Sequence, residues 1–169
     1  MTLATTAILT AVEECCLGTI GTVETVTAGT VLRGAYQPLD DDRIAALARV
    51  SPRVEVEWKG DRDTGMLPRM SSRASLEVKL LVRLVYAFDF ELQDAERKSV
   101  RGTAALTGNK IRNALTRNGN LTQTSAAVVT ELASGAMKKA ELKVVREDLK
   151  RRLWIAEVEC TGLVCTSRG

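Results

Sequence analysis

The sequence has no histidine among its 169 residues. Histidine is the commonest general base and the commonest metal ligand in proteins, so the usual starting point for an acid–base or metal-dependent active site is missing. Aromatic residues make up only 4% of the chain, which leaves few side chains on which nucleic-acid bases could stack. These two shortages favour a structural or binding protein over an enzyme.

The four cysteines also lack the spacing of a zinc site, because neither close pair has the form C-x-x-C. They are Cys15, Cys16, Cys160 and Cys165. We interpret them as free thiols, buried or half-buried, in a reducing compartment. A disulfide between the first helix and the last strand stays open as an alternative.

No apolar run reaches membrane-spanning length, and no basic region precedes the short apolar run at the N-terminus. We therefore expect a soluble protein made inside the cell, with no membrane partner. The chain is long enough for one domain with a proper core, and 45% of it is apolar. Its net charge of +3 is weak for a dedicated nucleic-acid-binding protein.

The most regular pattern is an alternation of apolar and polar residues from Ser75 to Phe90. Successive side chains of a strand point to opposite faces, so this alternation predicts a long half-buried strand. The buried face takes the even positions, from Leu76 onward. The odd face mixes charges with Leu81, Val85 and Ala87. We expect the N-terminal segment or another subunit to cover these three apolar residues.

Apolar residues at helical spacing predict a helix from residue 2 to about 16, which Gly18 and Gly21 end. The Thr/Val-rich run Val23–Leu32 fits a strand and an extended arm equally well, and such an arm spans residues 23–38. Three aspartates at 40–42 suit the start of a short helix that Pro52 ends.

Alternation over residues 54–58 predicts a strand, and glycine, proline and charge over residues 60–74 predict an exposed loop. Residues 94–117 have helical periodicity, with Gly102 and Gly108 off the apolar stripe. Strands are predicted at 126–132, at 140–144 and, after a charged turn at 146–151, at 152–165. This order predicts a single α+β domain over residues 1–169, a mainly antiparallel sheet with helices packed on one face.

The carboxylates Glu157 and Glu159 share one face of the last predicted strand, so a small enzyme with a paired-acid site is one hypothesis. We favour the solvent-facing half of an amphipathic strand. No serine has a histidine partner, and no phosphate-binding loop is present. We expect no catalytic activity, no metal and no cofactor.

Basic residues gather on the middle helix and in the C-terminal hairpin between Lys138 and Arg152, where they alternate with acidic ones. Mixed signs are typical of a solvated face or of ion pairs between subunits. A nucleic-acid-binding accessory module that uses this hairpin is an alternative function.

The order of elements resembles that of the tail terminator (tail completion) proteins of long-tailed bacteriophages and of related neck proteins at the head–tail junction. The likeness runs from the N-terminal helix through the strand Val54–Trp58 and the long strand Leu76–Phe90. It continues through the following helix to the strands around Val128–Leu132 and Trp154–Val158. It lies in element order, and no catalytic residue is carried over.

The resemblance implies a structural virion protein, assembled in the host cytoplasm, that forms a ring, a hexamer in this family. The ring caps the tail-tube protein and offers its other side to the head–tail connector, and DNA passes through its lumen without specific binding. Another neck or head-completion protein is an alternative within this reading. The expected subunit and partner contacts are Val23, Val26, Val31, Arg62, Asp63, Arg69, Arg73, Lys79, Leu81, Arg83 and Val85.

Overall fold

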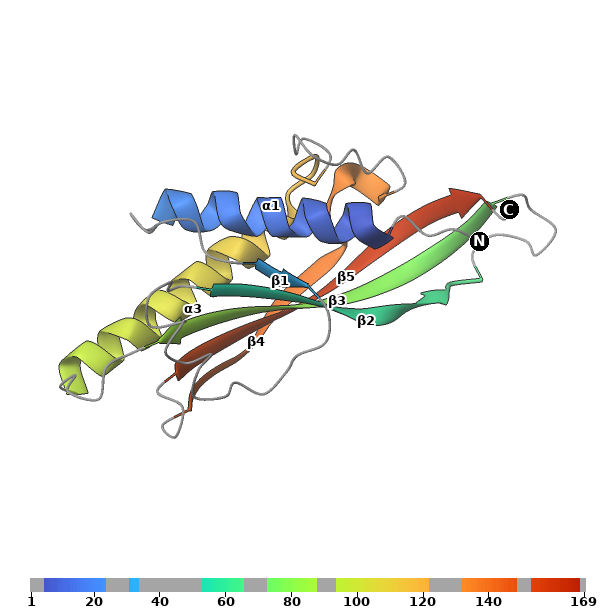
Figure 1. The fold of residues 1–169 in the computed structure, drawn as a ribbon. Coiled ribbons are helices and arrows are strands. Elements are labelled where there is room, and N and C mark those ends of the chain that lie inside the picture. Colours follow the sequence, from blue (N-terminus) through green and yellow to red (C-terminus); the bar gives the residue numbers. More distant parts are fainter. Residues whose placement is uncertain are drawn as a thin grey trace.

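The computed structural model describes residues 5–23, 31–33, 53–65, 73–87, 94–121, 132–148 and 153–167. In chain order the elements are α1 (Thr5–Val23), β1 (Val31–Arg33), β2 (Arg53–Asp63), β3 (Arg73–Ala87), α3 (Asp94–Thr116), a short 3₁₀ turn η1 (Ala133–Gly135), β4 (Lys139–Asp148) and β5 (Leu153–Ser167) (Figure 1). The strands form one sheet in the order β1-β2-β3-β5-β4. All neighbours are antiparallel except β1 and β2, which run parallel.

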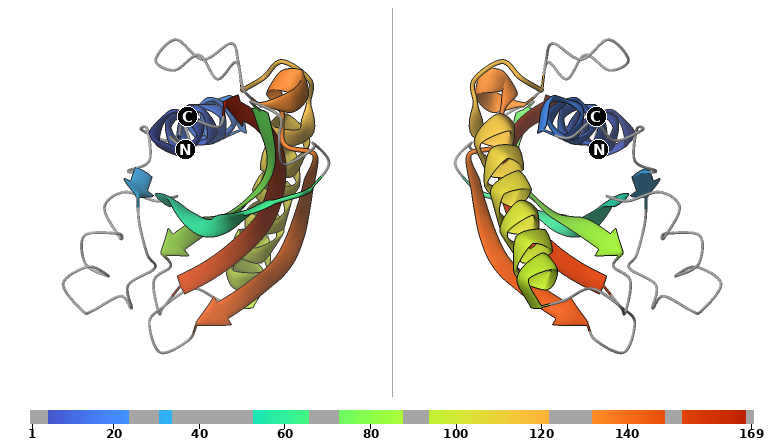
Figure 2. Two further views of the ribbon diagram at one scale, coloured as in Figure 1. Left: turned by 90° about the vertical axis from the view of Figure 1, so that its right-hand side faces the viewer. Right: turned by 90° about the vertical axis from the view of Figure 1, so that its left-hand side faces the viewer.

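The long predicted strand is the centre of this sheet. Leu80 and Val82 of β3 lie opposite Cys160 and Val158 of β5, and all four side chains are buried. The sheet curves around α1, and α1 and α3 both pack on the face that carries these residues (Figure 2). The chain is therefore an α+β domain with its helices on one face, as predicted.

Both helices bury an apolar stripe against this face. α1 contributes Ile8 and Val12, and α3 contributes Ile111 and Leu115, none of which is exposed to solvent. Burying one such side chain stabilises the fold by roughly 1.5 to 3 kcal/mol relative to leaving it in water. The helices are held mainly by this packing.

The end of the first helix was predicted wrongly, because α1 continues through Gly18 and Gly21 to Val23. Glycine weakens a helix by about 1 kcal/mol relative to alanine, but it ends a helix mainly by adopting positive φ. Gly18 is not among the described glycines with positive φ. The middle helix ends as predicted, at Thr116, and Gly119 follows with φ 81°.

Of the exposed loop predicted at 60–74, residues 60–63 belong to β2 and residues 73–74 to β3, whereas residues 66–72 lie outside the described residues. A β-bulge between Trp58 and Gly60 shifts the register, and Gly60 takes φ 118° there. Pairing with β3 then resumes as far as Asp63, and the backbone N–H of Thr64 donates to the carbonyl of Ser75 at 2.9 Å. A bulge absorbs one extra residue without ending a strand, which is why glycine here does not mark a loop.

A second bulge, between Leu142 and Val144, corrects the predicted hairpin. Ala140 and Leu142 face the helices as expected, but Val144 is turned to the opposite face and is 36% exposed. The predicted charged turn at 146–151 is also partly wrong, because β4 continues to Asp148.

Several predictions lie outside the described residues. They are the short helix after residues 40–42, most of the arm at 23–38, the strand at 126–131, and positions 88–90. Of the arm, Val31 and Leu32 belong to β1, paired with Val54 and Glu55 of β2. Of the strand at 126–132, Leu132 forms an isolated bridge with Val164.

The four cysteines are free thiols, as predicted, and no disulfide joins the first helix to the last strand. Cys165, however, is exposed and not buried or half-buried as expected. Burial raises the pKa of the Cys16 thiol well above its ordinary value and that of Cys160 to about 12. Since the thiolate is the reactive form, these two thiols are inert near neutral pH.

Gly108 is buried, in contrast to its predicted position off the apolar stripe. A Cβ at this position would lie 2.9 Å from Leu142 Cδ1 and 3.7 Å from the Cβ of Ala156. Here α3 approaches β4 and β5 closely, so a larger residue requires the Leu142 side chain to move. Gly102, six residues earlier, is exposed and has nothing within 4 Å of such a Cβ.

These two glycines give a matched pair of substitutions in one helix. Gly108→Val should lower the free energy of unfolding by about 1 to 3 kcal/mol, because it overpacks the contact with β4 and β5. Gly102→Val should leave it within about 0.5 kcal/mol. Urea unfolding followed by circular dichroism measures both. Equal effects of the two substitutions would contradict the close approach at Gly108.

Candidate interaction face

The side of the sheet opposite α1 and α3 is not covered by any helix that the structure describes. We call this side the open face and define it by Glu57, Lys59, Leu81, Arg83, Val144, Arg146, Glu157 and Glu159. It contains the odd-numbered residues of β3 and their partners on neighbouring strands. Most of these residues are charged, so the chemistry of the face is electrostatic.

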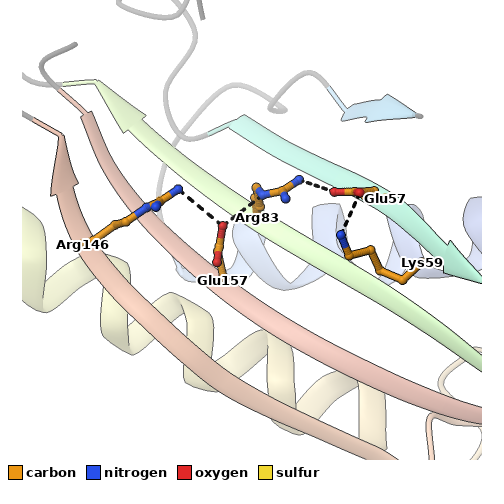
Figure 3. A network of polar contacts seen from close by, with 5 residues as sticks. All are labelled: Glu57, Lys59, Arg83, Arg146 and Glu157. Carbon is orange, nitrogen blue, oxygen red and sulfur yellow. Dashed lines mark hydrogen bonds and ion pairs between the residues drawn. The ribbon is translucent and has the colours of Figure 1, made fainter. Parts of the chain in front are cut away.

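Arg83 occupies the middle of the open face, and its side chain is only 9% exposed. Its Nη1 donates to Glu57 Oε2 of β2 at 2.6 Å, and its Nε donates to Glu157 Oε1 of β5 at 3.1 Å (Figure 3). Charge-assisted hydrogen bonds of this kind are about twice as strong as neutral ones. One guanidinium therefore ties together the three central strands of the sheet.

Two further cations extend this arrangement to both sides. Lys59 Nζ lies 3.0 Å from Glu57 Oε1, and Arg146 Nη2 of β4 lies 3.7 Å from Glu157 Oε1 (Figure 3). Cations and carboxylates thus alternate across β2, β3, β5 and β4 in what we call the charge row. Burial opposes ionisation of Glu57, but hydrogen bonds from Lys59 and Arg83 outweigh it and lower its pKa.

A second charged group lies on the edge strand β4, where Glu141 accepts from Lys139 at 2.5 Å and also from Lys143. These two hydrogen bonds lower the pKa of Glu141 to about 2. Lys143 also lies 3.9 Å from Glu159 of β5. Lys139 and Lys143 of the C-terminal hairpin are therefore paired with neighbouring carboxylates, whereas Lys138 is exposed.

Some apolar side chains on this side of the sheet are already buried within the single chain. Val85 and Ile155, which face each other at one end of the sheet, are each 1% exposed within the single chain. The expectation that Val85 contacts a second subunit is therefore wrong. Leu81 is half-buried and Val144 is exposed, and these two lie beside the charge row.

The other predicted contact residues are spread over the molecule. Lys79 is exposed on β3, next to the hairpin end formed by Arg62, Asp63 and Arg73, which are also exposed. The sequence analysis listed these residues together with Val23 and Val31 as one set of expected contacts. In the structure Val23 ends α1 and Val31 lies in β1. Val26 and Arg69 lie outside the described residues.

The hairpin end holds a shallow pocket of roughly 150 Å³. Lys59, Gly60, Asp61, Arg62, Glu77 and Lys79 line it. Arg62 Nη2 and Glu77 Oε1 are 2.8 Å apart on its wall, and the remaining charges are of both signs. Three cations and two carboxylates line the pocket, so its lining has a net charge of +1.

The proposed acid pair is engaged elsewhere, because Glu157 binds Arg83 and Arg146 and Glu159 lies near Lys143. Within the described residues, no three His, Cys, Asp or Glu side chains are grouped to hold a metal ion. Among the helices that the structure describes, none is long and apolar enough to cross a membrane.

Comparison with protein-family models and with curated proteins found no match. The open face is therefore interpreted from its own geometry. Sequence reasoning identified Arg83 and Leu81 but did not group Glu57 and Arg146 with them, although both belong to the charge row. Their common feature, opposite charge at matched register, is visible only once the strand pairing is known.

Replacing Arg83 tests the centre of the charge row. Arg83→Met should lower the free energy of unfolding by about 2 to 4 kcal/mol, because it leaves Glu57 and Glu157 without their shared cation. The control is Arg62→Met, whose side chain is 68% exposed and whose ion pair should contribute less than about 1 kcal/mol. A similar loss in both variants, measured by urea unfolding, would contradict the central role of Arg83.

The lowered pKa of Glu57 predicts a pH dependence. A carboxyl group whose folded pKa is depressed stabilises the fold above its unfolded pKa of about 4.3, and the effect is lost as pH falls through the folded pKa. The stability difference between the native protein and Glu57→Gln should therefore be constant near pH 7 and decrease progressively as the pH falls below about 4.3. Unfolding curves between pH 7 and 3 measure it, and a difference independent of pH would disprove this assignment.

Proposed function

We propose that this chain is a ring-forming structural protein of the head–tail junction of a long-tailed bacteriophage, a tail terminator that caps the tail tube and contacts the head connector. The ring is a homohexamer in this proposal, assembled in the host cytoplasm and retained in the virion. The resemblance in element order suggested this function. The observation that carries it is the open face, with alternating charges across four strands and no described helix over it.

The alternation of charge suits contact between copies. The charge row contains both cations and carboxylates. When a second copy of the chain meets it in a shifted register, the cations of one copy lie opposite the carboxylates of the other. Leu81 and Val144 add apolar surface beside the row. Head-to-tail contacts between different patches of identical subunits close into rings when the rotation permits. Electrostatic complementarity of this kind sets the register of a contact more than its affinity.

The edge strand β4 argues for contact through the face rather than through the edge. β4 pairs on one side only, with β5. Its bulge near Lys143 and its lysines are the features by which proteins protect open edges against indiscriminate strand addition.

The alternatives fit the structure less well. A nucleic-acid contact through the C-terminal hairpin would use Lys139, Lys143 and Arg146, all paired with carboxylates. A paired-acid enzyme would have to release Glu157 from two arginines.

Light scattering on the purified chain, alone and with assembled tail tubes of the same phage, tests the proposal. We expect rings of uniform mass, in solution or on tube ends. Val144→Glu places an unpaired charge on the open face and should abolish them. Leu106→Glu changes another exposed apolar residue, on α3, and should not. A protein that stays monomeric both alone and with tubes would refute the proposal.

A further inference from the structure

The charge of the chain is unevenly distributed. The segment from Arg97 to Leu121, which covers most of α3 and the turn after it, holds six basic residues and no acidic one. They are Arg97, Lys98, Arg101, Lys110, Arg112 and Arg117. Elsewhere 18 basic residues stand against 21 acidic ones, a net charge of −3. The positive charge of the protein is therefore concentrated in this segment, although α3 itself begins with the acidic residues Asp94 and Glu96.

Four of these cations project from the described surface without an ion pair to any carboxylate whose side chain the structure describes. Lys98, Arg101, Lys110 and Arg117 are exposed, and Arg101 lies over the ring of the buried Trp154, 5.7 Å from its centre. This differs from the open face, where Lys59, Arg83 and Arg146 each have a carboxylate.

The four cations lie on the exposed half of α3 and on the residue that follows it; α3 is the foremost element in the right-hand view of Figure 2. At a rise of 1.5 Å per residue, Lys98 and Arg117 are about 28 Å apart along the helix axis. With 3.6 residues per turn, Arg101 and Lys110 lie on opposite flanks of this exposed half, and Lys98 lies between them. Half-buried Arg112 donates to Asn113 Oδ1 at 3.2 and 3.3 Å rather than to a carboxylate. The exposed half of the helix thus carries positive charge on both flanks.

From these exposed cations we infer that the outer side of α3 contacts the phosphate backbone of duplex DNA without reading its sequence. A partner must carry regularly spaced negative charge over about 28 Å, and duplex DNA presents one charge per 1.7 Å of axis. α3 has no aromatic residue on which the bases of a single strand could stack.

Two other anionic partners fit less well. A helix lying on a membrane surface needs a broad apolar side to bury in lipid. The apolar side of α3 packs on the sheet, and Leu106 is its one exposed large apolar residue in the described part of the chain. An acidic protein would be expected to meet an apolar centre within the contact, and Leu106 alone provides little.

This inference does not depend on ring formation, because α3 lies on the side of the sheet opposite the open face. It differs from the passage of DNA without contact that the family resemblance implies. It also places the nucleic-acid contact on a different element from the C-terminal hairpin.

Fluorescence anisotropy with a 30-base-pair duplex of arbitrary sequence tests it. Four phosphate contacts predict a slope of about −3.6 in log affinity against log salt, or about a hundredfold loss between 50 and 200 mM. Replacing Lys98, Arg101, Lys110 and Arg117 together with glutamine should abolish binding. Arg117→Gln alone should reduce the slope by about one.

The control is the quadruple glutamine variant at Lys59, Lys139, Lys143 and Arg146, which has the same net charge of −1 but leaves α3 intact. It should bind DNA as the native protein does. Circular dichroism establishes that both variants are folded, and the Val144→Glu protein repeats the assay without assembly. Equal loss in both quadruple variants, no binding of the native protein at 25 mM salt, or equal competition by polyglutamate would each overturn the inference.

Discussion

The guanidinium of Arg83, held between two carboxylates in the middle of the sheet, is the interaction on which the arrangement of the strands depends. Removing a charge from water is costly unless hydrogen bonds replace its hydration. Those bonds come from Glu57 and Glu157, on the strands to either side. A slip of one residue in either pairing would turn Arg83 toward the helices or turn its partners away from it. The charge row and the apolar core therefore specify the same register.

The same alternation gives the two sides of the sheet different tasks. Even-numbered residues of β3 bind α1 and α3 through apolar packing, whereas Arg83 and its neighbours leave a polar face that those helices do not cover. A face with balanced positive and negative charges disfavours binding to unrelated surfaces. It still favours a surface whose charges are arranged in the complementary pattern. This combination suits a subunit that must stay dispersed until it meets its own kind at one location.

Helices and strands with a regular hydrophobic period were predicted well from the sequence, but the β-bulges that interrupt this period were not. β3 and α3 follow two- and 3.6-residue periods over many residues, so their positions and buried sides were correct. The bulges near Lys59 and Lys143 each insert one residue, which changes the facing of every residue beyond them. Gly60 therefore looked like the start of a loop, and Val144 was placed with the wrong neighbours.

The candidate site was predicted in part for a similar reason. Arg83 was singled out as one of the residues on the odd face of the long strand, but its partners lie 26 residues before it and 74 after it. Only strand pairing brings such distant carboxylates to one place. Val85 was misjudged because its burial depends on the whole chain and not on the alternation around it.

The imbalance of charge between α3 and the remainder of the chain also makes the subunit an electric dipole. In the field of a polyanion such a molecule experiences a torque as well as an attraction, and it turns before any contact forms. It would approach helix first, with the charge-balanced side of the sheet pointing away and free to receive its neighbours. In this way the basic segment Arg97–Leu121 would orient the whole particle during its encounter.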